Sequence, residues 1–259
     1  MDNGQRRLLA TMPLHAITST YGEEGLRERF AVEIESLPEQ DRRRLNQALD
    51  LASRLHANDR REREPYVNHL LRVAIRIMSH YGVHDADVIV AALLHDAVED
   101  HAAELAGRGV GVDDQEAALA ALAAEFGPRV AELVGAVTNP KYSPDRDVNE
   151  QYREHVAQSL RSRPWARVIK ASDFTDNGVG LIHTTGPRVR TLAGKYAPLV
   201  PILRELIDLP DTPLEAPARQ HILAQLDRAA DRFAAVLPPG EPPREADPTD
   251  RHHRGQEGG

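Results

Sequence analysis

The sequence contains no cysteine among its 259 residues. Disulfide frameworks, cysteine-ligated zinc or iron–sulfur sites, and cysteine nucleophiles are therefore excluded. Aromatic residues are also scarce, at 4% of the chain, whereas strands usually draw on aromatic and β-branched side chains. The composition thus favours helices, and a chain of this length can bury a sizeable core.

Positive net charge and long apolar runs are missing too. The chain has 32 basic and 40 acidic residues, a formal net charge of −8, which argues against broad nucleic-acid binding. No run approaches the roughly 18 apolar residues of a membrane span, and the first fifteen residues lack the apolar stretch of a signal peptide. We therefore expect a cytoplasmic protein without a nucleic-acid or membrane partner. Its oligomeric state is left open.

Apolar residues recur at three- to four-residue spacing along most of the chain, which predicts an all-α fold. The expected helices span residues 23–37, 39–58, 65–81, 85–101, 115–126, 129–137, 149–160, 165–176, 195–209 and 217–237. We expect an N-terminal extension at 1–38 with an extra helix, and a main helical domain at 39–237. Residues 238–259 have too little apolar material to offset the entropy cost of ordering, which predicts a disordered tail.

The most apolar run, residues 88–94, directly precedes His95, Asp96, Glu99 and Asp100. On one continuous helix His95 would lie beside Glu99, and Asp96 beside Asp100. Such groups are costly to bury unless they are paired or bound to a cation, and three acids are unfavourable at a helix C-terminus. A metal ion would offset both costs. A hydrated, charged helix end is the alternative.

Two further positions extend this constellation. His69 opens the apolar run of the preceding expected helix, and Asp173 and Asn177 are four residues apart on a later one. Taken singly, His69 is more often a hydrogen-bonded core histidine, and the Asp173–Asn177 pair an exposed helix face or a cap. The order His, then His-Asp, then Asp across three helices is much more specific.

These motifs resemble those of the HD-domain metal-dependent phosphohydrolases. Within that family they are similar to the hydrolase branch of the RelA/SpoT homologues, the guanosine tetraphosphate 3′-pyrophosphohydrolases. The resemblance covers about residues 40–205, with motifs at 60–69, 91–100, 126–138 and 169–177. It implies an HD-domain helical bundle around a central metal site. Because no synthetase or regulatory domain follows, a stand-alone small alarmone hydrolase is expected.

The resemblance also implies a set of site residues. The implied ligands of one divalent cation, most often Mn²⁺, are His69, His95, Asp96 and Asp173. Mixed imidazole and carboxylate ligands suit such an ion. Glu99 and Asp100 are implied to position and deprotonate the attacking water. Arg60, Arg61 and Asn177 are implied to contact the guanosine polyphosphate, and arginine suits both base stacking and phosphate binding.

The sequence departs from the family pattern at two places. After Asp173 the family usually reads Arg-Leu-x-Asn-x-Arg, whereas residues 174–180 here lack both arginines and contain two glycines. The residue after Glu99-Asp100 is commonly threonine and here is His101. Substrate choice therefore stays open between guanosine tetra- or pentaphosphate and another nucleotide, such as the 2′-phosphate of NADPH. A non-catalytic HD binding module, for instance an antitoxin-like partner of an alarmone synthetase, is a further alternative.

Overall fold

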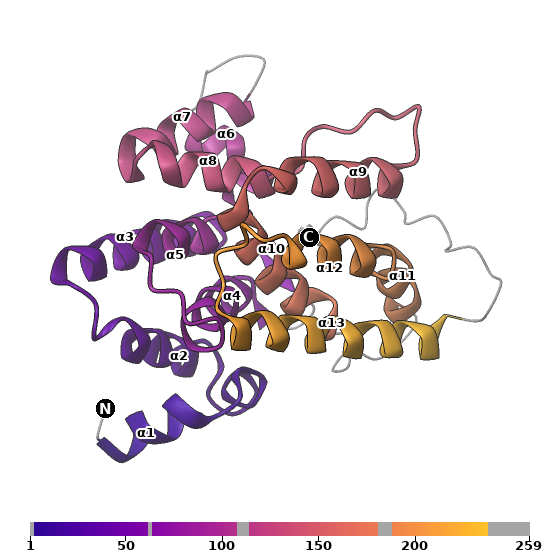
Figure 1. The fold of residues 1–259 in the computed structure, drawn as a ribbon. Coiled ribbons are helices and arrows are strands. Elements are labelled where there is room, and N and C mark those ends of the chain that lie inside the picture. Colours follow the sequence, from indigo (N-terminus) through magenta and orange to yellow (C-terminus); the bar gives the residue numbers. More distant parts are fainter. Residues whose placement is uncertain (1–2, 62–63, 108–113, 181–187, 238–259) are drawn as a thin grey trace, which may run out of the picture. The chain divides into compact units, whose positions relative to one another are not determined.

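The computed structural model describes residues 3–61, 64–107, 114–180 and 188–237, which are mostly helical (Figure 1). Within these ranges the strands are β1 (Arg60–Arg61) and β2 (Glu64–Pro65), which pair antiparallel. The expected all-α fold is confirmed. The predicted tail at 238–259 lies outside the described residues. None of the described helices combines the length and apolarity that crossing a membrane requires.

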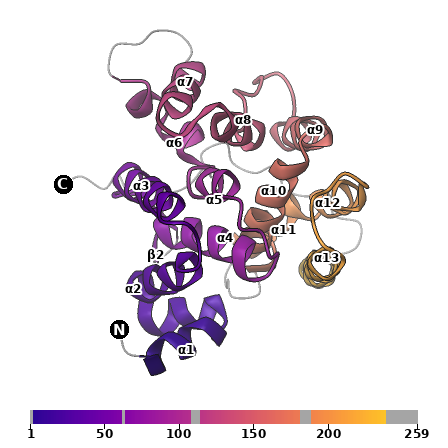
Figure 2. The same cartoon turned by 60° about the vertical axis from the view of Figure 1, so that its left-hand side comes forward.

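The helices form two compact units, and the first ends at Thr138. Its helices are α1 (Asn3–Thr11), α2 (Leu14–Ile34), α3 (Glu39–Leu55), α4 (Val67–Ser79), α5 (Ala86–Leu93), α6 (Ala97–Leu105), α7 (Asp114–Phe126) and α8 (Pro128–Val137). Helix α4 packs against both α2 and α5, as Figure 2 shows. Its apolar side chains are buried along its whole length, so α4 forms the centre of this unit.

The second unit begins at Asn139. Its helices are α9 (Val148–Arg161), α10 (Pro164–Asn177), α11 (Arg188–Tyr196), α12 (Leu199–Asp208) and α13 (Ala216–Val236). Helix α12 packs against α9, α10 and α13. The buried Arg167 of α10 donates from Nε to the Leu160 carbonyl at 2.9 Å and from Nη1 to Thr212 at 3.0 Å. Helix α10 is thereby fixed to the end of α9 and to the turn after α12.

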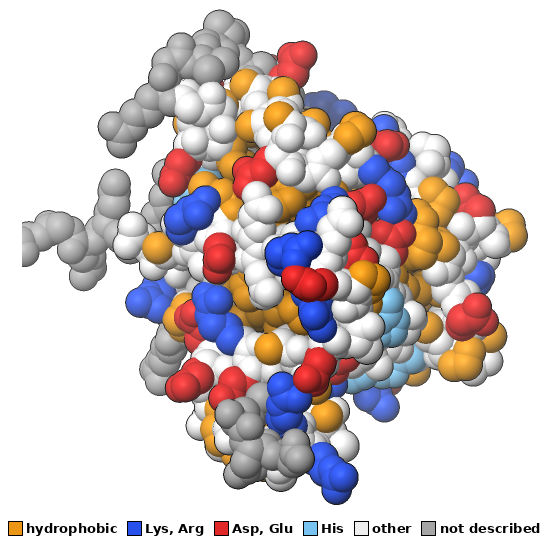
Figure 3. Space-filling view, turned by 90° about the vertical axis from the view of Figure 1, so that its left-hand side faces the viewer, with side chains coloured by type: hydrophobic (Ala, Val, Ile, Leu, Met, Phe, Trp, Pro, Cys, Tyr) orange, Lys and Arg blue, Asp and Glu red, His pale blue; other side chains and the backbone are white. Residues whose placement is uncertain are grey.

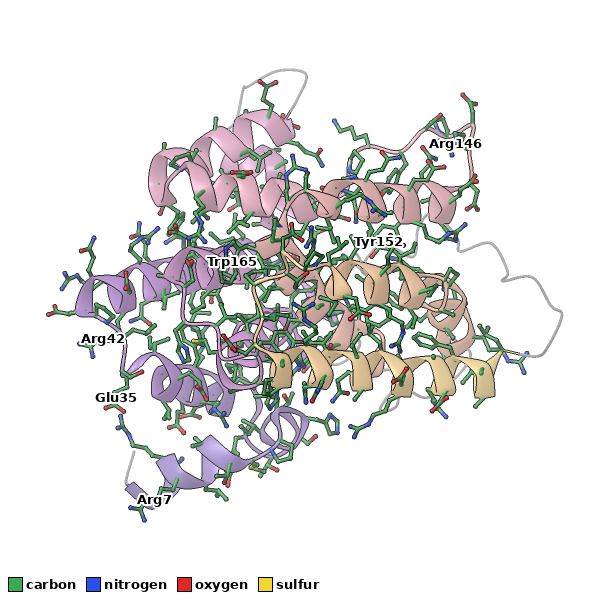
Figure 4. The ribbon with its side chains drawn as sticks, in the orientation of Figure 1. Arg7, Glu35, Arg42, Arg146, Tyr152 and Trp165 are labelled. Atoms are coloured by element: carbon green, nitrogen blue, oxygen red, sulfur yellow. The ribbon has the colours of Figure 1, made fainter. Side chains whose placement is uncertain are left out.

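The unit boundary after Thr138 falls inside the expected 39–237 domain. Helix α2 of the expected N-terminal extension packs on α4 within the first unit. Arg42 of α3 donates to the Glu35 carbonyl at 2.9 Å, which fixes the turn between α2 and α3 (Figure 4). The expected domain limits at residues 38 and 237 stay predictions.

Basic and acidic side chains are interspersed over the face shown in Figure 3. Surface ion pairs of the first unit include Arg6 with Glu35 at 2.8 Å and Arg44 with Asp87 at 2.7 Å. Exposed pairs of this kind each contribute little to stability, about 0–1 kcal/mol. The mixture agrees with the modest net negative charge of the sequence.

The single helix expected at 85–101 is wrong. Helix α5 ends at Leu93, the chain turns through residues 94–96, and α6 starts at Ala97. The His95 ring donates from Nδ1 to the Ala92 carbonyl at 2.8 Å, so a side chain satisfies one of the carbonyls exposed at the end of α5. A turn that contains this local hydrogen bond therefore interrupts a segment whose apolar pattern favours a continuous helix.

This turn changes two of the sequence arguments. His95 and Glu99 do not share one helix, so their expected pairing has no basis. Asp96 and Asp100 remain one turn apart, because the Asp100 N–H donates to the Asp96 carbonyl at 3.0 Å. The acids Glu99 and Asp100 lie in the first turn of α6, where the helix dipole favours negative charge. The helix-dipole argument for a metal ion therefore fails, and the prediction of a metal site depends on the geometry of the side chains.

Other expected helices differ mainly at their ends. Pro65 belongs to β2 and not to the first turn of α4, because it pairs with Arg60 of β1. The helix expected at 195–209 is divided between α11 and α12, with Ala197 and Pro198 between them. Proline lacks a backbone N–H and is best tolerated at such a helix start.

Candidate metal centre

Three of the predicted ligands converge within the first unit. His69 comes from α4, and His95 and Asp96 come from the turn between α5 and α6. The two Nε2 atoms are 3.3 Å apart, and Asp96 Oδ2 lies 3.1 Å from His95 Nε2 and 3.6 Å from His69 Nε2. Ligand bonds of about 2.0–2.2 Å place neighbouring donor atoms roughly 3 Å apart. The three donor atoms therefore fit one divalent cation.

The hydrogen bond of His95 determines which ring nitrogen is free to bind. A carbonyl only accepts, so the Nδ1 that lies 2.8 Å from the Ala92 carbonyl carries the proton. In the neutral ring Nε2 then holds a lone pair directed at His69 and Asp96. Metal-binding histidines are commonly oriented in this way by a backbone carbonyl. The local backbone thus prepares His95 as a ligand.

Asp96 is held from the other side by Tyr66, the residue before α4. The Tyr66 hydroxyl donates to Asp96 Oδ2 at 2.7 Å. Burial would raise the pKa of Asp96, but His95 and His69, when their rings are protonated, lower that pKa well below its usual range. Burial and the Asp96 charge raise the pKa of Tyr66 well above its usual value. The carboxylate is therefore ionised and the phenol stays a donor.

Glu99 and Asp100 lie next to this cluster along the chain, in the first turn of α6. The Glu99 side chain is exposed and Asp100 is half-buried. Asp100 follows the ligand Asp96 by one helical turn, through the backbone hydrogen bond described above. Solvent therefore reaches Glu99 close to the candidate ligands.

Asp173 and Asn177 belong to α10 in the second unit, so their place beside His69, His95 and Asp96 stays a prediction. Within α10, Asn177 Nδ2 donates to Asp173 Oδ1 at 2.5 Å, and Lys170 Nζ donates to Oδ2 at 2.9 Å. Burial would lower the pKa of Lys170, but Asp173 and Tyr152 raise it well above its usual value. Lys170 was not among the predicted site residues, although it donates to the predicted ligand Asp173.

The Lys170 ammonium also lies over an aromatic ring of its own unit. Lys170 Nζ and Lys195 Nζ are each 5.4 Å from the ring centroid of Tyr152, a residue labelled in Figure 4. Cations at this distance are attracted to the face of an aromatic ring. Two positive charges therefore gather around one buried tyrosine in the second unit.

The predicted substrate residues Arg60 and Arg61 form β1. Arg60 is exposed. The Arg61 guanidinium carbon lies 5.5 Å from the ring centroid of Tyr66, a cation–π distance. Because Tyr66 also donates to Asp96, a single side chain connects β1, which carries both arginines, to the candidate ligands.

A second group of His and Asp side chains was not predicted. His56, Asp59 and His101 offer ligand atoms that lie within 4.8 Å of one another. His101 had been singled out as a departure from the family pattern. No sequence pattern marked His56 or Asp59 as a site residue, because only the folded chain brings α6 against the end of α3.

Comparisons with known proteins agree with the motifs. Residues 48–163 match the model of the HD domain. The chain is 38% identical over 133 residues to human guanosine-3′,5′-bis(diphosphate) 3′-pyrophosphohydrolase MESH1, a match that covers 50% of this chain and 64% of that protein. It is 30% identical over 161 residues to the 3′-pyrophosphohydrolase of Aquifex aeolicus, covering 61% of this chain and 20% of that protein. The chain thus matches less than two thirds of the length of these relatives.

A solved structure agrees with the fold. It is described as a metazoan ortholog of SpoT that hydrolyses ppGpp and plays a role in starvation responses. The two chains share 25% sequence identity with a TM-score of 0.53, over 75% of this chain and 97% of that one. The His and Asp groups of the site also support binding of a divalent metal. The chain is therefore similar to HD domains over residues 48–163, to human MESH1 over about half of its length, and to the solved metazoan ortholog of SpoT over 75% of its length.

Proposed function

We propose that this protein hydrolyses the 3′-diphosphate of guanosine tetra- or pentaphosphate, releasing pyrophosphate and GDP or GTP. The observation that carries the proposal is the arrangement of His69, His95 and Asp96, whose donor atoms lie 3.1–3.6 Å apart. It occurs in an HD domain similar to named 3′-pyrophosphohydrolases. The substrate is thus a small guanosine polyphosphate, and the reaction takes place in the cytoplasm.

The proposed ligands of the ion, Mn²⁺, are His69, His95, Asp96 and Asp173. Nitrogen and oxygen donors without thiolate suit Mn²⁺. The ionised Asp96 supplies negative charge that a divalent ion needs, and Lys170 orients the Asp173 carboxylate. When bound, such an ion polarises a phosphate oxygen and acidifies a bound water.

Glu99 and Asp100 are the groups that we assign to the attacking water. Both lie in the first turn of α6, directly after the ligand Asp96. A solvent-exposed carboxylate such as Glu99 can accept the proton of the water and release it to bulk solvent. Asp100, half-buried, would orient the same water.

The guanosine polyphosphate is assigned to Arg60, Arg61 and Asn177. The flat guanidinium of Arg60 is exposed and free to stack on a base or to pair with a phosphate. Arg61 lies over Tyr66 and would present its donors beside the ligand cluster. Asn177 donates to Asp173 through Nδ2, so its amide oxygen is the group assigned to the nucleotide.

The test identifies products by mass. Purified protein with Mn²⁺ is incubated in three separate reactions, which contain guanosine tetraphosphate, guanosine pentaphosphate or NADPH. We expect pyrophosphate with GDP or GTP from the first two. Asp96→Asn is expected to abolish the reaction, whereas Asp50→Asn, at an exposed carboxylate of α3, is the matched control that retains it.

Two results would contradict the proposal. Release of inorganic phosphate from NADPH, without turnover of the guanosine nucleotides, would assign the chain to another nucleotide. Binding of guanosine tetraphosphate without any product, in protein shown to hold its metal, would assign it to the non-catalytic class.

A further inference from the structure

The cluster of His56, Asp59 and His101 lies outside the proposed catalytic ligand set. His56 follows the last residue of α3, Asp59 is three residues later, and His101 lies within α6. Asp59 Oδ2 is 2.8 Å from His56 Nδ1 and 2.7 Å from His101 Nε2. One carboxylate oxygen thus meets a nitrogen of each of two imidazoles that are 45 residues apart in the sequence.

The backbone around Asp59 and around His101 favours the contact between these two side chains. The Asp59 N–H donates to the His56 carbonyl at 3.1 Å, and the Asp59 carbonyl accepts from the Tyr66 N–H at 3.2 Å. In α6 the helical backbone is interrupted at His101, where φ is −130° and ψ is 30°. The interruption directs His101 toward Asp59, and the rings of His56 and His101 meet edge to face with centroids 4.5 Å apart.

The protonation states suit a metal site. Burial lowers the pKa of His56 to about 4, so its ring is neutral near pH 7 and can offer a lone pair. Burial alone would raise the pKa of Asp59, but hydrogen bonds from His101 and His56 lower it. The cluster therefore presents a neutral imidazole and an ionised carboxylate, the forms that bind metal.

The ring nitrogens that face away from Asp59, His56 Nε2 and His101 Nδ1, also allow metal coordination. In the present structure His56 Nδ1 donates to Asp59 Oδ2, and within the described residues His56 Nε2 is buried without a hydrogen-bond partner, so Nε2 is the nitrogen that would carry the ring proton once a metal ion binds Nδ1. The outer nitrogen of His101, Nδ1, lies 3.8 Å from Glu104 Oε2. A carboxylate near the far nitrogen is a common second contact of metal-binding histidines. A divalent ion would therefore displace one proton from the nitrogen of each ring that faces Asp59.

Exposure leaves room for the remaining ligand of an ion. The His56 side chain is fully buried, whereas Asp59 and His101 are 20% and 16% exposed. Two nitrogens and one oxygen with an open side are the donor set of many zinc sites that keep one water ligand. We propose that His56 Nδ1, Asp59 Oδ2 and His101 Nε2 bind a second divalent cation, Zn²⁺, with water completing the coordination.

This site adjoins the candidate metal centre through Tyr66. The His56 ring stacks on the Tyr66 ring with centroids 4.7 Å apart and planes 13° apart. The Tyr66 hydroxyl donates to Asp96. An ion on His56 therefore fixes the ring against which Tyr66 packs, and through it the ligand Asp96. The inference itself does not rest on the proposed hydrolase activity, because metal content is measured without substrate.

The first experiment counts zinc. The full chain, with both tail histidines His252 and His253 replaced by alanine, is stripped with a chelator, reloaded with excess ZnCl₂, desalted and analysed for zinc per chain. His101→Gln is expected to hold one ion fewer than this parent, while the exposed His84→Gln is unchanged. Asp96→Ala is expected to lose a different ion, so that Asp96→Ala/His101→Gln holds two fewer than the parent.

Two results of this count would overturn the inference. Unchanged zinc in folded His101→Gln would show that the cluster is only a hydrogen-bonded network. Loss of all zinc from His101→Gln would show that it only supports the other site. The double variant separates the two proposals, because the zinc lost with His101 does not depend on whether Asp96 binds an ion.

A second experiment introduces a spectroscopic ligand. The chain has no cysteine, so Asp59→Cys would place its single thiol in the cluster, at a side-chain length close to that of aspartate. Loading with Co²⁺ is expected to give a thiolate-to-cobalt charge-transfer band in the near ultraviolet. A Co²⁺-loaded Asp50→Cys protein provides the control without the band. The absence of the band from folded Asp59→Cys would contradict the site.

Discussion

The chemistry of the candidate metal centre depends on a few hydrogen bonds around its ligands. The Ala92 carbonyl fixes the proton of His95 on Nδ1, and the Tyr66 hydroxyl fixes one oxygen of Asp96. Each contact removes a rotational freedom that a ligand would otherwise lose on binding. Preorganisation of this kind commonly changes metal affinity by about 10- to 100-fold.

Tyr66→Phe tests this positioning role. The substitution removes only the hydroxyl that donates to Asp96 Oδ2, so we expect Mn²⁺ to bind about 10- to 100-fold more weakly. Competition with a chelating dye measures the affinity, and the exposed Tyr21→Phe is the matched control. An affinity equal to that of the wild type would show that Asp96 needs no such support.

Glu99→Gln separates chemistry from metal binding. The glutamine keeps the size of the side chain but lacks the basic carboxylate, and general-base catalysis contributes about 10²–10⁴-fold. We expect kcat to fall by that order while elemental analysis finds the metal retained. Glu132→Gln, at an exposed position of α8, serves as control. If Glu99→Gln kept a normal kcat, Asp100 would become the candidate base.

At the scale of elements, the start of α5 determines where the ligand turn is placed. Asp85 caps this helix, accepting from the Asp87 N–H at 3.0 Å and the Val88 N–H at 3.4 Å. Arg129 of α8 donates to both Asp85 carboxylate oxygens, at 2.8 and 2.7 Å. The cap therefore joins α5 to α8, and α5 leads directly to His95 and Asp96.

Asp85→Ala is expected to lower the free energy of unfolding by about 1–2 kcal/mol, because a helix cap is lost. Urea denaturation at pH 7 measures the change, with Asp50→Ala as the exposed control. Burial would raise the pKa of Asp85, but Arg129 and two backbone N–H groups lower it. The contribution of the charge is thus complete above about pH 4 and is lost as the pH falls through the lower folded pKa.

The difference in stability between wild type and Asp85→Asn isolates this charge, since asparagine still caps. That difference should be largest near pH 7 and should shrink below pH ~4. A difference that stays constant down to pH ~2 would show that the Arg129 pair contributes nothing.

At the scale of the whole molecule, an ion that binds only the folded chain couples metal content to stability. An ion at 100 times its Kd stabilises a protein by about 2.7 kcal/mol. We expect added Mn²⁺ to raise the Tm of the wild type, measured by circular dichroism, and to have little effect on Asp96→Ala. An equal rise in both would place the stabilising ion outside the candidate metal centre.

The sequence alone predicted much about this protein because that information is local. Helical periodicity follows from which side chains lie on one face within a few turns, so most helices were predicted to within a few residues. His69, His95 and Asp96 were recognisable because their motifs preserve residue type and spacing. The absence of cysteine likewise limited the metal donors to nitrogen and oxygen.

Only the tertiary structure decided the features that depend on distant contacts. The break of the 85–101 segment places His95 beside His69 of α4, a contact between helices that the local sequence pattern does not contain. The contact of Tyr66 with Asp96 joins residues thirty positions apart, so it required the folded chain. The cluster of His56, Asp59 and His101 arises because α6 folds back over the end of α3, and a contact between residues more than forty positions apart leaves no periodic trace in the sequence.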